Sequence, residues 1–238
     1  MKSKNLRVPY GLSVHGNDEI KAVIKVLKSS TQMGKHVSIF EKKISKLFSK
    51  KYGLMVNSGS SALMLAMETL DIPEGSEVIT PALTFSTTVS PIIHADLIPV
   101  FVDVHFKTLQ INEKLIEKAI TAKTVAIMAP NLIGNISDWK ELKKIASKHN
   151  LFLIEDSADT IGYTINNKNT GIYSDIVTNS FYASHIINGG GTGGIVCFND
   201  YKLYKKAKLL RGWGRSSATF NESESIEKRF NVKISGID

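Results

Sequence analysis

The sequence predicts an α/β fold in which a mostly parallel sheet lies between layers of helices. Short runs of consecutive apolar residues recur along the chain, and segments with helical periodicity separate them. Strands that are apolar on both faces are typical of parallel sheets that helices cover on both sides. The chain has 238 residues, 42% of them hydrophobic, which is enough for one large domain with a substantial core.

The expected strands follow one another through most of the chain. They are the apolar runs at residues 54–57, 77–80, 99–103, 124–128, 151–154, 175–181 and 195–198. Pro81 ends the second of these runs, because proline has no N–H to donate to a neighbouring strand. We see no internal repeat and no low-complexity linker, so one continuous sheet is the simplest arrangement.

The expected helices alternate with these strands after two amphipathic helices at the start. Their apolar residues recur three and four positions apart, and they span residues 17–29, 37–48, 62–70, 86–95, 112–121 and 138–149. Asn17 or Asp18 is a suitable N-cap for the first helix, and Ser137 is expected to cap the last.

Composition excludes several classes of protein. No window holds the roughly 18 uninterrupted apolar residues of a membrane span, and the N-terminus lacks the apolar region of a signal peptide. The single cysteine, Cys197, fits a reducing cytoplasm and is expected to be a buried small hydrophobe. The net charge is +8, but the lysines are spread over helix-like faces. This pattern favours a solvated surface, or attraction for a small phosphorylated substrate, over binding to nucleic acid.

Polar residues gather where the predicted strands end, at residues 58–61, 84–86, 155–157 and 180–185. In open α/β sheets, ligands bind beyond the carboxyl ends of the strands. These four clusters are therefore expected to share one edge of the sheet.

Residues 57–61 join a strand to a helix and have the features of a phosphate cradle. Glycine allows close approach, the helix N-terminus offers N–H groups, and the serines add hydroxyls. A simple Ser N-cap fits equally well. The turn lacks the Gly-Lys-Ser/Thr end of a Walker loop. Residues 189–194 match the spacing GxGxxG but run into a strand, not a helix, which indicates a tight loop framing a pocket.

Three single residues at this edge have a chemical and a structural interpretation. Asp156 ends an apolar strand, where a carboxylate suits a protonated ring nitrogen or the cap of the next segment. Phe85 suits stacking on a planar ring or packing in the core. His185 suits acid–base chemistry or a structural hydrogen bond. No second ligand lies at metal-binding spacing from His185, and no Gly-x-Ser-x-Gly elbow is present.

Together these motifs resemble the DegT/DnrJ/EryC1/StrS family of sugar aminotransferases. These are fold-type I pyridoxal phosphate (PLP) enzymes, similar in fold to aspartate aminotransferase, that act on nucleotide-linked keto sugars. The resemblance covers nearly the whole chain and is carried by residues 58–63, 81–85, 99–103, 155–158, 180–182 and 210–215. It implies that residues 1–238 form the cofactor-binding large domain, with residues 1–35 as an N-terminal arm and helix. The small C-terminal domain of the family is expected to be absent beyond Asp238.

The resemblance assigns a role to each candidate residue. Ser60, Ser61 and Ser180 would hold the cofactor phosphate. Phe85 would stack on the pyridine ring, and Asp156 would pair with its nitrogen and make the ring an electron sink. Asp159 falls where the aminotransferases carry Gln near the ring hydroxyl of the cofactor. A homodimer is also expected.

His185 is where the sequence departs from the aminotransferases, which have at this position the Lys that anchors the cofactor covalently. An imidazole cannot form that bond. A His here is similar to the 3-dehydratases of the family, which use pyridoxamine phosphate (PMP). In those enzymes the His takes a proton from the cofactor's methylene and the hydroxyl on sugar carbon 3 leaves. No cysteine follows residues 210–215, so no iron–sulfur cluster is expected.

The sequence therefore predicts a PMP/PLP-dependent, 3-dehydratase-like enzyme that acts on a nucleotide-linked 4-keto-6-deoxyhexose, with His185 as acid and base and without a metal. Two alternatives remain open. One is an aminotransferase in which another lysine serves, although no Lys lies between Lys168 and Lys202. The other is a non-catalytic or degenerate fragment of the fold.

Overall fold

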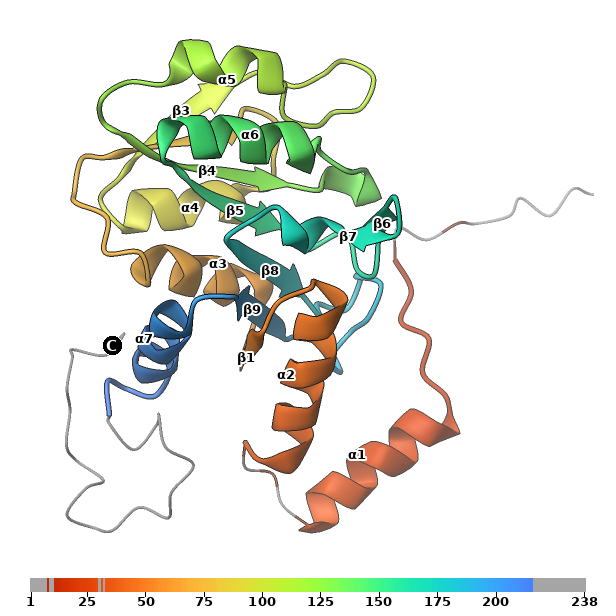
Figure 1. The fold of residues 1–238 in the computed structure, drawn as a ribbon. Coiled ribbons are helices and arrows are strands. Elements are labelled where there is room, and N and C mark those ends of the chain that lie inside the picture. The colour runs from red at the N-terminus through yellow and green to blue at the C-terminus, as the bar shows by residue number, and fades with distance from the viewer. Residues whose placement is uncertain (1–7, 9–10, 30, 32, 216–238) are drawn as a thin grey trace, which may run out of the picture.

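The structure is a computed structural model, and it describes residues 8, 11–29, 31 and 33–215. Its centre is a seven-stranded sheet with the strand order β1-β9-β8-β5-β4-β2-β3 (Figure 1). The strands are β1 (Tyr52–Val56), β2 (Glu77–Pro81), β3 (Ile98–Val102), β4 (Thr124–Pro130), β5 (Phe152–Asp156), β8 (Ile176–Ser180) and β9 (Gly194–Phe198). A separate two-stranded hairpin is formed by β6 (Thr164–Ile165) and β7 (Lys168–Asn169).

The sheet is parallel except at β9. Strands β3, β2, β4, β5 and β8 pair in parallel, whereas β9 runs antiparallel to both β8 and β1. Two reversals leave β1 parallel to β8. The carboxyl ends of six strands therefore meet the start of β9 at one edge of the sheet, where the sequence predicts the polar clusters.

Helices cover both faces of the sheet. One face carries α3 (Gly59–Glu68), α4 (Ser86–His94) and α7 (Tyr201–Arg211), and the other carries α2 (Lys35–Leu47), α5 (Glu113–Ala119) and α6 (Trp139–His149). Short 3-10 helices lie at η1 (Leu132–Gly134) and η2 (Thr170–Ile172). Alternate residues of each strand enter opposite cores: Leu153 faces α6 and Ile154 faces α3. Cys197 is fully buried in the core beside α2, as expected.

The boundaries correct the sequence analysis at a few points. Ser137 does not cap α6. The cap is Asp138, whose side chain accepts from Glu141 N at 3.0 Å, while the Ser137 hydroxyl donates to Gln110 and to Pro130 O. Pro81 is the last residue of β2 and pairs with Val102 of β3. The strand pattern did not reveal that β9 is antiparallel, because an apolar run reads the same in both directions.

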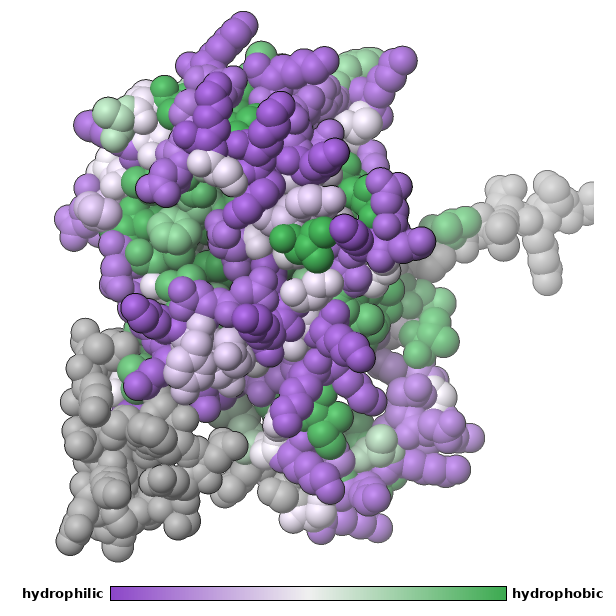
Figure 2. Space-filling model, in the orientation of Figure 1, coloured by the Kyte–Doolittle hydropathy of each residue, from purple (hydrophilic) through white to green (hydrophobic). Residues whose placement is uncertain are grey.

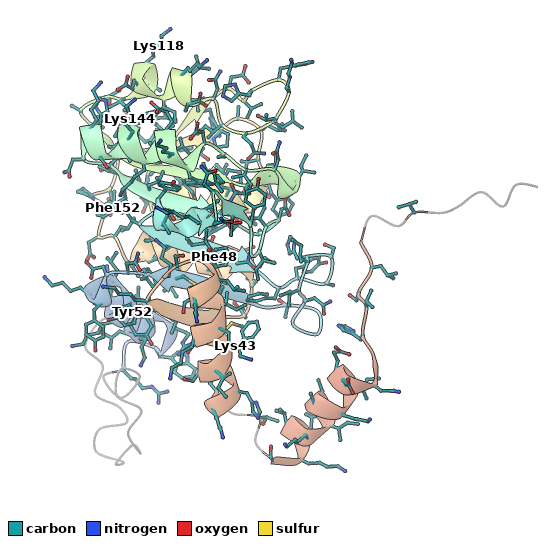
Figure 3. All side chains as sticks on the ribbon, turned by 45° about the vertical axis from the view of Figure 1, so that its right-hand side comes forward. Lys43, Phe48, Tyr52, Lys118, Lys144 and Phe152 are labelled. Atoms are coloured by element: carbon teal, nitrogen blue, oxygen red, sulfur yellow. The ribbon has the colours of Figure 1, made fainter. Side chains whose placement is uncertain are left out.

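α1 (Asn17–Ser29) is set apart from the rest of the fold (Figures 1 and 3). It contains no buried residue, and its apolar residues Ile20, Val23, Ile24 and Leu27 are 45–67% exposed. Hydrophilic residues cover much of the face seen in Figure 2, and Lys118 and Lys144 point outward from α5 and α6 (Figure 3). Among the described helices, none has both the length and the apolar character to cross a membrane.

Candidate functional site

The N-terminus of α3 lies directly against the end of β8. Ser58 bridges to Gly193 just before β9, and Ser180 pairs with Gly194. A Cβ added to Gly59 would lie 2.7 Å from the Cβ of Ser180, so only glycine allows this approach. The structure thus brings the predicted Ser58–Ser61 turn and Ser180 together.

The turn at the start of α3 contains a Ser N-cap and also has free N–H groups that suit a phosphate. Ser58 is the N-cap, and its Oγ accepts from Ser61 N at 3.1 Å. The backbone N–H groups of Gly59 and Ser60 stand at the first positions of the helix, where a helix offers no carbonyl partner. Together with the Ser180 hydroxyl beside them, they form a place where an anionic group can bind.

Asp156 is a buried carboxylate on the same face of the sheet as α3 and α4. It is 6% exposed, and its Oδ2 accepts from Thr88 Oγ1 of α4 at 2.9 Å. Its Oδ1 accepts from Ala158 N at 3.1 Å. Burial raises the pKa of Asp156 to about 6, and the hydrogen bonds from Thr88 and Ala158 oppose this increase. A cation placed beside Asp156 would favour the ionised form, so the site suits a protonated ring nitrogen.

Phe85 is not a core residue. Its side chain is 69% exposed, immediately before α4, and its carbonyl accepts from Thr88 N at 3.0 Å. Because Thr88 also holds Asp156, the exposed ring and the buried carboxylate are linked through one residue. Thr84 extends the link, since its Oγ1 donates to Thr88 Oγ1 at 2.9 Å. The start of α4 thus connects an exposed aromatic side chain to a buried carboxylate.

His185 lies in the loop after β8 and faces Asp159. Its Nδ1 is 3.5 Å from Asp159 Oδ1, and the two side chains are 22% and 37% exposed. Asp159 Oδ2 accepts from Ile133 N at 2.9 Å. The structure therefore places Asp159 beside His185, a contact that the sequence analysis did not predict. A carboxylate on one ring nitrogen fixes the orientation of an imidazole and leaves the other nitrogen available for proton transfer.

The segment before α1 contacts the loop that carries His185. Ser13 Oγ donates to Ala183 O at 2.9 Å, and a Cβ on Gly11 would lie 2.7 Å from Ser184 Cβ. His15 Nε2 lies 2.8 Å from Asn188 Oδ1. The glycines of residues 189–194 lie close to Phe181: Gly189 N donates to Phe181 O, and a Cβ on Gly193 would lie 3.2 Å from Phe181 Cβ. Residues 189–194 thus run into β9 and not into a helix, which is not the arrangement of a dinucleotide fingerprint.

Asp156 has a fully buried neighbour on the opposite face of the sheet, Glu155. Four side chains donate to its carboxylate: Asn131, Ser157, Thr170 and Ser174. Burial raises the pKa of Glu155, while the hydrogen bonds and the nearby charge of Lys50 lower it. This network connects β4, β5 and η2 behind the candidate site.

Within the described part of the chain, no group of three or more His, Cys, Asp and Glu residues could hold a metal ion. The chemistry that the edge offers is an anion site at α3, an aromatic face at Phe85, a buried acid at Asp156 and a paired imidazole at His185. The sequence pattern of the DegT/DnrJ/EryC1/StrS aminotransferase family matches residues 14–238. The chain belongs to this family.

Individual members of the family are similar along most of this chain. It is 36% identical over 215 residues to dTDP-4-dehydro-2,6-dideoxy-D-glucose 3-dehydratase of Saccharopolyspora spinosa, a match that covers 87% of this chain and 46% of that protein. The structure superposes on Escherichia coli GDP-4-keto-6-deoxy-D-mannose-3-dehydratase with bound hydrated PLP at a TM-score of 0.90 and 31% identity, covering 98% of this chain and 64% of that one. A Psychrobacter cryohalolentis aminotransferase gives a TM-score of 0.88 at 30% identity, with 96% and 59% covered.

These DegT/DnrJ/EryC1/StrS relatives confirm the predicted family and the fold-type I architecture. The chain spans about half the length of the curated relatives that it matches. Sequence reasoning missed Thr88 and Ile133 as partners of the site carboxylates. Thr88 lies on the first turn of α4, three residues after Phe85, and that spacing is the one signal that could have indicated it.

Proposed function

We propose that this protein is a PMP/PLP-dependent enzyme of nucleotide-sugar metabolism that removes the 3-hydroxyl of a nucleotide-linked 4-keto-6-deoxyhexose. The single observation that carries the proposal is His185, which the family resemblance puts at the position of the aminotransferases' lysine and which lies 3.5 Å from Asp159. Two of the similar proteins named above are sugar 3-dehydratases. We also propose a role for each residue of the candidate site.

The residues at the sheet edge fit a phosphorylated pyridine ring. The N-terminus of α3, with Ser60, Ser61 and Ser180, would hold the phosphate. The exposed Phe85 would stack on the ring, and Asp156 would pair with the ring nitrogen. Burial disfavours the ionised form of Asp156 when it has no cation beside it, and a protonated pyridine nitrogen supplies that cation.

The bound PMP would supply the amine that joins the sugar carbonyl and the electron sink that stabilises negative charge. Asp156 keeps the ring cationic by its own negative charge. Asp159 orients His185 through Nδ1, which leaves Nε2 to take a proton from the cofactor's methylene. The protonated Nε2 then assists departure of the sugar's 3-hydroxyl. Because His185 cannot anchor the cofactor covalently, Phe85 and the α3 turn must retain it by stacking and hydrogen bonds.

The experiment that tests this function uses the full-length protein with PMP, glutamate and a nucleotide-linked 4-keto-6-deoxyhexose. The expected product is a 3-deoxy sugar. A stable 4-amino sugar, with no 3-deoxy sugar, would show that the protein is an aminotransferase instead.

The aminotransferase alternative has one specific observation in its favour, the similarity to the Psychrobacter cryohalolentis aminotransferase. In that case another lysine would have to reach the cofactor. Borohydride reduction of the PLP-loaded protein, followed by peptide mass analysis, would find the cofactor attached to that lysine. A protein that binds neither PLP nor PMP by absorbance would support the remaining alternative, a non-catalytic fragment of the fold.

We also propose the domain organisation, the cellular location and the oligomeric state of the protein. Residues 1–238 act as the cofactor-binding large domain, with residues 1–35 as its N-terminal arm and helix. The protein works in the cytoplasm, where a lone buried thiol such as Cys197 stays reduced. It is a homodimer, and light scattering of the full-length protein tests this directly.

A further inference from the structure

Gln110 is a buried residue outside the candidate site, and it holds the turn that follows β4. Its side chain is 3% exposed. Its Nε2 donates to Leu132 O at 3.0 Å, and its Oε1 accepts from Leu132 N at 3.2 Å. Ser137 Oγ donates to the same Oε1 at 3.1 Å. A side-chain amide that pairs with both backbone groups of one residue fixes that residue as a neighbouring strand would.

The next residue, Ile133, has an unusual backbone conformation. Its φ of 59° and ψ of 30° lie in the left-handed region, which β-branched residues rarely adopt. Its side chain is 71% exposed, so packing does not enforce this conformation. Such strain persists where surrounding contacts hold it. Those contacts are Gln110, which clamps Leu132 on one side, and Asp159, which accepts from Ile133 N on the other.

The bond from Ile133 occupies one oxygen of Asp159 and leaves the other facing the imidazole. Oδ2 accepts from Ile133 N at 2.9 Å, and Oδ1 lies 3.5 Å from His185 Nδ1. We propose that Gln110 is a positioning residue for His185, acting through the Leu132–Gly134 turn and Asp159. This inference rests on the proposed function, in which His185 uses Nε2 for proton transfer.

The chain of contacts predicts which nitrogen of His185 carries the proton in the neutral ring. A carboxylate at Nδ1 favours the form protonated at Nδ1, whereas a free imidazole favours the form protonated at Nε2. Without the hydrogen bonds from Gln110 to Leu132, we expect Ile133 to leave the left-handed conformation. Its N–H then no longer donates to Asp159, and the Asp159 carboxylate is free to turn away from His185. Gln110→Met keeps the length of the side chain and removes its two hydrogen bonds to Leu132, together with those to Ser137 and Thr108, so it is the variant that tests the proposal.

The measurement is nitrogen-15 NMR of the full-length protein with labelled histidine, at a pH at which imidazole is neutral. The spectrum of His185→Asn identifies the His185 signals. In Gln110→Met we expect the share of the Nδ1-protonated form to fall at least about twofold, and exchange of the Ile133 amide to quicken about tenfold, as for the loss of one hydrogen bond. Ile133→Gly keeps the N–H and suits a left-handed turn, so it is the matched control and retains the wild-type signature.

If Gln110→Met does not fold, Gln110→Glu keeps the acceptor for Leu132 N and Ser137 Oγ and removes the Nε2 donor to Leu132 O and Thr108 O. In this variant too, we expect the Nδ1-protonated share to fall and the Ile133 amide to exchange faster. A folded Gln110 variant with the wild-type tautomer and the wild-type exchange rate overturns the inference. Neither signal requires cofactor or sugar. A wild-type protein that forms no 3-deoxy sugar therefore overturns the proposed function alone, while a shifted tautomer in Gln110→Met still supports the positioning role.

Discussion

In the proposed function, His185 determines which reaction the site performs. Its side chain can move protons but cannot hold the cofactor covalently, and the structure places Asp159 on its Nδ1 side. Phe85, Asp156 and the α3 turn bind the cofactor in the proposal without help from His185. Catalysis and cofactor retention are therefore expected to respond separately to substitutions at the site.

Substitution of His185 tests this separation. We expect His185→Asn to reduce formation of the 3-deoxy sugar by at least about a hundredfold, the scale of general acid–base catalysis, and to leave the PMP affinity nearly unchanged. Phe85→Ala is the complementary variant and is expected to weaken PMP binding. Equal losses of PMP affinity in the two variants would contradict the separate roles.

The pKa of Asp156 predicts how cofactor affinity depends on pH. Its pKa is raised from 3.8 to about 6, so the buried carboxyl is neutral below about pH 6 and ionised above it. Only the ionised form pairs with the protonated ring nitrogen, and we therefore expect PLP affinity to fall as the pH drops through about 6. The phosphate of the cofactor also titrates in this range. Asp156→Asn is the control for titration of the phosphate. We expect this variant to bind PLP weakly, with a pH dependence that comes from the phosphate alone. The same pH profile in both proteins would refute the assignment.

At the scale of elements, the sequence predicted much of what builds the site. Consecutive apolar residues predicted the buried strands, and the polar residues after them predicted the shared edge. The antiparallel direction of β9 and the contact between Asp159 and His185 were not predictable in this way. Both depend on how the loop after β8 turns back on the sheet, which no local pattern in residues 181–193 specifies.

The junction between α3 and β8 gives a prediction at the same scale. In Gly59→Ala the new Cβ would lie 2.7 Å from Ser180 Cβ, so the helix must move away from the strand. We expect PLP affinity to fall at least about tenfold, since the phosphate contacts from the two elements no longer converge. Gly16→Ala is the control, because its Cβ meets only the flexible side chain of Glu19 at 3.3 Å. Fluorescence titration with PLP measures both, and equal affinities would argue against this phosphate site.

For the whole molecule, a buried polar network around Glu155 joins the ends of β4 and β5 to η2, on the face of the sheet opposite Asp156. Glu155 is fully buried and accepts hydrogen bonds from Asn131 after β4, from Ser157 after β5, and from Thr170 and Ser174 in and after η2. The sequence marked Glu155 only as part of a polar cluster. Its role as a structural acid depends on partners up to 24 residues away, and these are set by the tertiary fold.

Removal of the Glu155 carboxylate tests this structural role. Glu155→Ala leaves four buried donors without their acceptor, and we expect the free energy of unfolding to fall by about 3 kcal/mol or more. Urea denaturation followed by fluorescence and by circular dichroism measures the loss. Glu117→Ala removes an exposed acid that pairs with Lys148 and should change the stability little. A Glu155 variant as stable as the Glu117 variant would show that the network does not hold the layers together.

The central claim is that this chain uses His185 to remove a sugar hydroxyl. A single turnover of PMP-loaded full-length protein with a nucleotide-linked 4-keto-6-deoxyhexose, followed by carbon-13 NMR of the sugar, tests it most directly. We expect carbon 3 to become a methylene in the wild type and to keep its hydroxyl in His185→Asn. A wild-type product with the hydroxyl retained on carbon 3 and an amine on carbon 4 would contradict it.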